Sequence, residues 1–220
     1  MWLLAAATVV AILNSVGAAI FERVHPMPSG ADDVGRWFLL MNRVVLPGEV
    51  IRLALTIGAL VIVMQLPRAT AVAAGAVVAL LGTWLVPFGL SLLTPTLLAH
   101  LSPTAAIWIP STGSTLVGLI YLVLLVLTLD RIGRSVDARL PATLTSLLYV
   151  LVAMMPLLFI AQASTRYATL DGGWSHDSTA ELIGAVAEIR SHAWSLLLLV
   201  SLAWLLRRLG ARGAKAVRAA

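Results

Sequence analysis

Six stretches of this chain are long and apolar enough to cross a lipid bilayer as helices. A membrane-spanning helix needs about 20 mostly apolar residues to cross roughly 30 Å of hydrocarbon. The sequence predicts such spans at about 2–21, 47–66, 69–93, 110–129, 141–163 and 186–206. Because backbone N–H and C=O groups must be paired internally in lipid, these stretches favour helices. We therefore predict an all-α polytopic integral membrane protein, a bundle of about six transmembrane helices in a single domain covering 1–220.

The composition excludes the alternative of a water-soluble fold. Apolar types make up 60% of the chain and charged residues 11%, with a mean hydropathy of +0.98. A typical globular domain has about 25% charged residues. The absence of cysteine excludes disulfides, thiolate metal sites and cysteine nucleophiles. The excess of Ala, Leu, Val and Arg suggests a high-GC bacterial gene, and hence a bacterial inner membrane.

The connections between the spans are expected to differ in character. Pro67 and Arg68 form a tight connection, whereas the longer connections at 22–46, 94–109 and 164–190 are expected to form a polar cap. Residues 37–45 suggest a short interfacial helix, because Trp and Arg suit the headgroup region. The sixth element is expected to begin at Ser178, at a capping-box pattern, and to end near Gly210. Residues 207–220 are expected to form a basic cytoplasmic tail.

The basic residues lie at the ends of the apolar stretches rather than in one soluble patch, which argues for membrane topology and against nucleic-acid binding. With six spans, both termini share one face, and that face carries nine of the positive residues: Arg68, Arg131, Arg134, Arg139, Arg207, Arg208, Arg212, Lys215 and Arg218. The opposite face carries six: Arg23, Arg36, Arg43, Arg52, Arg166 and Arg190. Positive loops stay in the cytoplasm, so we predict a multi-pass protein of the cell membrane with both termini cytoplasmic.

Most acidic residues and all four histidines fall on the predicted outer face or just inside it. Among them, Glu188, His192 and Ser195 follow one stripe of the sixth helix, and the first two are an i,i+4 pair. An ionisable residue inside the bilayer is a functional candidate because of its energetic cost. The alternative is a structural pair at headgroup depth.

Three further residues belong to the candidate polar ligand site, and a fourth polar residue, Asn14, is interpreted separately. Glu49 and Arg52 are expected to open the second helix, where Glu suits the helix dipole and Arg52 can pair with it. His100 lies in the third connection. Asn14 lies midway along the first span and is expected to bond to another helix, a packing interaction rather than a catalytic one.

No catalytic motif and no metal-ligand pattern occurs, and the cofactor, if any, is not indicated. We therefore predict a non-enzymatic membrane protein, either a transporter or permease-like protein or an accessory subunit of a membrane complex. Its expected partners are the lipid bilayer and other membrane subunits, with no nucleic acid. The alternative hypothesis is a membrane-embedded oxidoreductase, with haem or a metal bound by His100, His192 and nearby carboxylates at the outer face.

Overall fold

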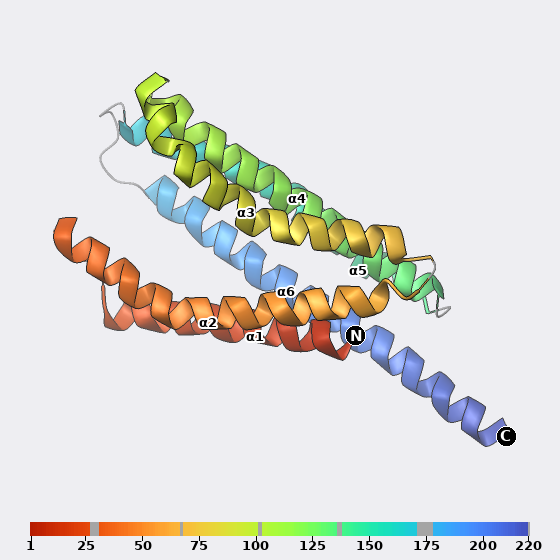
Figure 1. The fold of residues 1–220 in the computed structure, drawn as a ribbon. Helices are drawn as coiled ribbons and strands as arrows, with labels where there is room; N and C mark the ends of the chain where they lie inside the picture. The colour runs from red at the N-terminus through yellow and green to blue at the C-terminus, as the bar shows by residue number, and fades with distance from the viewer. Residues whose placement is uncertain (27–30, 67, 101–102, 136–137, 171–177, 220) are drawn as a thin grey trace. The chain divides into compact units, whose positions relative to one another are not determined.

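The computed structural model describes residues 1–26, 31–66, 68–100, 103–135, 138–170 and 178–219. Within these ranges the chain forms six helices: α1 (Trp2–Val24), α2 (Ala31–Val63), α3 (Thr70–His100), α4 (Pro103–Ser135), α5 (Ala142–Leu170) and α6 (Ser178–Ala219) (Figure 1). Each contains a stretch long and apolar enough to cross a membrane. The predicted fold class, all-α with six membrane-spanning helices, is confirmed.

The helices extend well beyond the apolar stretches that identify them. α2 begins at Ala31 and continues through Pro47, so the expected interfacial helix at 37–45 and the expected second span are one helix of 33 residues. α3 and α4 together likewise cover most of 94–109. Much of each predicted connection is therefore helical, because helical backbone continues where hydropathy falls, and the polar cap stays a prediction. Hydropathy reports the bilayer thickness, whereas helix length is limited only by backbone pairing.

α6 also exceeds its predicted length. It begins at Ser178, as the capping pattern predicts, and continues to Ala219, so the expected end near Gly210 is wrong. The side chains of Ser178 and Glu181 lie outside the described residues, and the capping box stays a prediction. A glycine costs a helix only about 1 kcal/mol, which α6 accommodates at Gly210.

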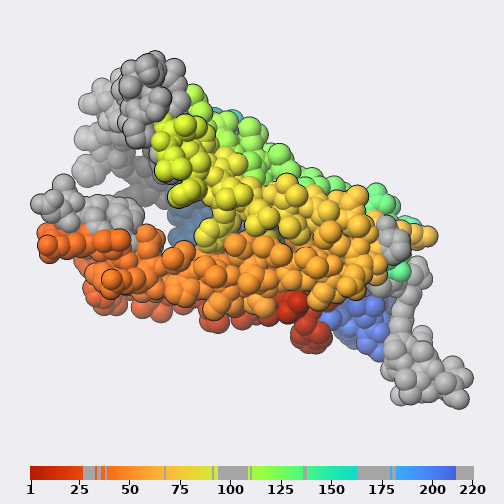
Figure 2. Space-filling model, viewed as in Figure 1, coloured from red at the N-terminus to blue at the C-terminus, as the bar shows by residue number. Residues whose placement is uncertain are grey.

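The chain divides into two compact units, each described here by itself. One unit comprises Met1–Ile62 together with Leu198–Ala220, and the other comprises Val63–Leu197. In the first, α1 and α2 pack antiparallel: Gly48 lies against Asn14, and Gly58 lies against Leu3. The atoms of these two helices are in contact in the space-filling view, where they are coloured red to orange (Figure 2).

In the second unit, glycines bring α3 and α4 close together. A Cβ at Gly82 would lie 2.9 Å from Val117 Cγ1, and one at Gly75 would lie 3.4 Å from Leu124 Cδ1. Small residues of α3 therefore make a close helix contact with α4, as small residues do between helices in membranes. α4 and α5 pack through a buried cluster of Val126, Leu148 and Val152, against which Trp194 and Leu197 of α6 also lie.

Large apolar side chains cover much of the outside of these helices. No more than 22% of any candidate span is buried, and exposed residues include Leu13, Ile20, Val78, Leu157 and Ile189. An apolar surface of this extent would drive aggregation in water but is solvated by lipid chains. The protein is therefore a multi-pass membrane protein whose helices contact lipid.

Candidate functional site

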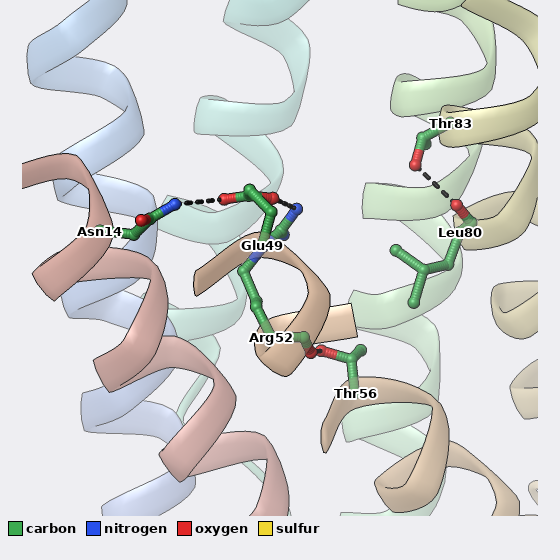
Figure 3. Close-up of polar contacts among 6 residues, drawn as sticks. All are labelled: Asn14, Glu49, Arg52, Thr56, Leu80 and Thr83. Atoms are coloured by element: carbon green, nitrogen blue, oxygen red, sulfur yellow. Dashed lines mark hydrogen bonds and ion pairs between the residues drawn. The ribbon is translucent and has the colours of Figure 1, made fainter. Parts of the chain in front are cut away.

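The side chains of Asn14, Glu49 and Arg52 form a connected polar network between α1 and α2 (Figure 3). Asn14 Nδ2 donates a hydrogen bond to Glu49 Oε1 at 3.1 Å. Arg52 donates from Nε and Nη2 to the other carboxylate oxygen, Oε2, at 3.0 and 2.5 Å. Both oxygens of one carboxylate are thus occupied by donors from two helices. Charge-assisted hydrogen bonds of this kind are roughly twice as strong as neutral ones.

This network lies inside a candidate membrane span of both helices. α1 is 23 residues long, about 35 Å at 1.5 Å per residue, and Asn14 is close to its midpoint. Glu49 and Arg52 lie in the interior of α2, within the part of that helix that is apolar enough to cross a membrane. Both helices therefore place the network inside a candidate span rather than at a helix end.

The sequence interpretation of Glu49 as a first-turn residue is therefore wrong. Its pairing with Arg52 is as predicted, but both residues lie inside α2 rather than at its start. The error came from Pro47, which favours the first turn of a helix because it lacks an N–H. Here the proline is accommodated within the helix instead, as membrane helices permit when neighbours pair the released groups.

Gly48 explains how Asn14 reaches Glu49. A Cβ at position 48 would lie 2.7 Å from Asn14 Cγ and 3.2 Å from its Cβ, so any larger residue would require the Asn14 side chain to move. Glycine therefore allows α1 to approach α2 at this level. One turn beyond the pair, Thr56 Oγ1 donates to the backbone oxygen of Arg52 at 2.7 Å, so its hydroxyl is paired within the helix. Because the side chains of Arg52 and Glu49 are 29% and 28% exposed, the protein does not seal the network completely.

The predicted stripe on α6 lies on an exposed surface. His192 Nε2 lies 3.6 Å from Glu188 Oε1, an ion-pair distance but too long for a hydrogen bond, and the two side chains are 41% and 64% exposed. Ser195 Oγ donates to the backbone oxygen of Ser191 in its own helix at 3.1 Å. The side chains of Glu188 and His192 are therefore exposed rather than enclosed.

Sequence reasoning missed the role of Arg190, which lies between Glu188 and His192 in the chain. Its Nη1 donates to the backbone oxygen of Leu151 in α5 at 3.3 Å, and its side chain is half-buried. Leu151 is next to Val152, whose carbonyl has no intrahelical donor because Pro156 lacks an N–H. The only feature of the sequence that could have indicated the contact between Arg190 and Leu151 is the nearby Pro156.

The second missed feature is an aromatic cluster between the end of α1 and the start of α2. The rings of Phe21 and His25 stack with centroids 4.8 Å apart, and Trp37 Nε1 donates to the backbone oxygen of His25 at 2.6 Å. Amphipathic aromatic rings favour the bilayer interface. This cluster is consistent with a membrane boundary near that end of the two helices.

The oxidoreductase hypothesis needs His100, whose side chain lies outside the described residues. Among the side chains that are described, no group of three or more His, Asp or Glu residues could hold a metal ion. The proposed site of His100 and His192 with nearby carboxylates stays a prediction.

Searches against protein-family models, curated protein sequences and solved structures found no match to this chain.

Proposed function

We propose that this protein is a non-enzymatic, transporter-like membrane protein that binds a polar solute at the network of Asn14, Glu49 and Arg52. The observation that carries the proposal is the position of a Glu–Arg pair within a candidate membrane span, bonded to a residue of the neighbouring helix. A charged side chain at that depth costs at least about 2.5–3.5 kcal/mol, and such residues mark substrate and ion pathways. A network needed only for packing could use uncharged side chains at lower cost.

The partial exposure of both charged side chains supports a ligand site over a sealed structural pair. A solute that replaces one partner must reach the pair, and both charged side chains are partly exposed. The hydrogen-bonding groups are also held by two different helices, so that a ligand between them would change how α1 and α2 interact. Helix rearrangement around a site near the midplane is how many transporters give alternating access.

A second candidate function is that of an accessory subunit of a membrane complex. It is favoured by the exposed Glu188 and His192 on α6, which lie in a span where polar groups are expected to be covered. A helix of another subunit packed on this stripe would remove both side chains from lipid.

We also propose that both termini are cytoplasmic and that the membrane is a bacterial inner membrane. The face that carries both termini has nine positive residues and the opposite face has six, and loops rich in Lys and Arg stay in the cytoplasm.

The experiment is a solute screen on the full-length protein in lipid nanodiscs, with tryptophan fluorescence to follow thermal unfolding. The panel contains small carboxylates, amines, amino acids and sugars. We expect at least one class to raise the unfolding temperature of the wild type and of Arg43→Gln, but not of Arg52→Gln. Arg43 is the matched control because it is an exposed arginine on the same helix, outside the network. The proposal is contradicted if no solute raises the unfolding temperature of the wild type. It is also contradicted if a solute raises the unfolding temperature of Arg52→Gln by the same amount.

A further inference from the structure

The donors around Glu49 have the arrangement that a carboxylate-binding site requires. Asn14 Nδ2, Arg52 Nε and Arg52 Nη2 all point at the two oxygens of one carboxylate, at 3.1, 3.0 and 2.5 Å. The forked guanidinium is the preferred partner of a planar carboxylate, and the amide adds a neutral donor. The carboxylate now in this position belongs to the protein itself.

From this geometry we infer that the network is a monocarboxylate site in which Glu49 occupies the place of the ligand. The ligand carboxylate takes the donors of Asn14 and Arg52, and the displaced Glu49 carboxylate takes up one proton from water to become the neutral acid. This inference rests on the proposed function, because it names the solute class for the same site.

The proton follows from the charge balance. With Glu49 ionised, the pair of Glu49 and Arg52 has no net charge. A bound monocarboxylate beside an ionised Glu49 would leave a net negative charge in a low-dielectric region, which is costly. Protonation of Glu49 restores neutrality: one anion and one proton enter together, and an O–H bond forms on the displaced carboxyl. Binding of a monocarboxylate is therefore expected to leave the net charge of the site unchanged.

No other described charged group contacts Glu49. On α2, Arg52 is its ionic partner, and Arg43 is exposed more than one turn away. On α1, the contact is the uncharged Asn14, and the charged residues Glu22 and Arg23 lie at the far end of the helix.

The ligand could come from water or from the bilayer, as a small organic acid or as a fatty acid. The test uses sodium lactate and sodium decanoate as probes, with ethylammonium chloride and sodium chloride for comparison, on full-length protein in nanodiscs at pH values from 5.5 to 7.5. Isothermal titration in two buffers of different ionisation enthalpy gives the number of protons taken up per ligand bound.

We expect a carboxylate to bind with uptake of about one proton and with an apparent Kd that rises about tenfold per pH unit where Glu49 is ionised. Binding to lactate alone identifies a water-soluble ligand, and binding to decanoate alone identifies a bilayer-soluble one. In Glu49→Gln the pH dependence should disappear, whereas Arg52→Gln should lose at least tenfold in affinity and Arg43→Gln should match the wild type.

Carboxylate binding without proton uptake by the wild type would overturn the inference, and this measurement needs no variant to fold. Binding of ethylammonium but of neither carboxylate, with loss in Arg52→Gln, would refute the carboxylate class and leave the proposed function standing. If no probe binds in this test and no solute in the wider panel raises the unfolding temperature, both the carboxylate inference and the proposed function are wrong.

Discussion

The side-chain amide of Asn14 donates a hydrogen bond to the carboxylate of Glu49, which is 35 residues later in the chain and on the neighbouring helix. Through this bond a polar residue in the middle of α1 meets a charged pair in the middle of α2. The contact joins Asn14 to the ion pair that the sequence predicts between Glu49 and Arg52, and it places a polar network inside the candidate spans.

The hydrogen bond between Asn14 and Glu49 should contribute measurably to stability. Interhelical hydrogen bonds in membranes are worth about 0.6–2 kcal/mol. We expect a double-mutant cycle of Asn14→Ala and Glu49→Ala, followed by unfolding in bicelles, to give a coupling free energy in that range. Additive effects of the two substitutions would show that the bond is not made in the membrane.

The ion pair of Glu49 and Arg52 should be more sensitive to the loss of one partner than of both. Removing one partner leaves an unpaired charge, which we expect to cost about 1–3 kcal/mol at this partly exposed site, less than for a fully buried pair. Glu49→Gln and Arg52→Gln should therefore each lower the unfolding temperature more than the double variant does. A double variant less stable than either single variant would contradict this account.

Gly48 should be required for the approach of α1. In Gly48→Ala the new methyl group would lie 2.7 Å from Asn14 Cγ, so the amide must turn away from Glu49. We expect a lower unfolding temperature and loss of the coupling between Asn14 and Glu49. Gly17→Ala is the control, because a Cβ there has nothing within 4 Å. If Gly48→Ala leaves the coupling intact, the close approach at this level is wrong.

Gly133 should be required where the chain leaves α4. A Cβ there would lie 2.9 Å from the backbone oxygen of Ala138, whose own N–H donates to the oxygen of Gly133 at 2.7 Å. Because the obstacle is backbone, Gly133→Ala should destabilise the protein by about 1–3 kcal/mol. Gly184→Ala, at a position with open space, should be neutral or stabilising. Equal thermal stability of the two variants would count against this turn.

The exposed stripe on α6 should tolerate substitution in the isolated protein. Glu188→Gln and His192→Ala should leave membrane insertion intact and change the unfolding free energy by less than about 0.5 kcal/mol, because both side chains are exposed. An effect on co-purification of a partner subunit, without an effect on stability, would support the accessory-subunit function. A large loss of stability in the isolated protein would mean that the stripe is buried.

The fold class followed from the sequence because bilayer thickness imposes a length on each apolar stretch. The helix ends could not be predicted from the sequence. α2 and α6 continue as helices through polar residues such as Arg36, Arg43 and Arg208, where hydropathy does not indicate whether the backbone is helical. The pairing of Glu49 with Arg52 followed from their i,i+3 spacing. The position of this pair within the helix could not be predicted, because Pro47 is a residue type typical of the first turn of a helix.

The contact between α1 and α2 required the structure. Asn14 was expected to bond to another helix, but the partner depends on which faces pack and at what level. Gly48 decides that level by admitting α1, and a single glycine in an apolar helix does not identify its neighbour. The contact of Arg190 with Leu151 is hidden for the same reason, because a backbone acceptor leaves no mark in the sequence.

The central claim is that Asn14 and Glu49 meet near the middle of the bilayer. The chain has no cysteine, so single cysteines can carry a spin label specifically. Leu13 and Val50 are exposed neighbours of the two residues, and Val24 is exposed at the end of α1. Collision rates with oxygen and with a nickel chelate, measured on Leu13→Cys, Val50→Cys and Val24→Cys in bilayers, give the depth of each label. We predict similar, near-central depths for Leu13→Cys and Val50→Cys and a shallow depth for Val24→Cys. Shallow depths at all three positions would contradict the account.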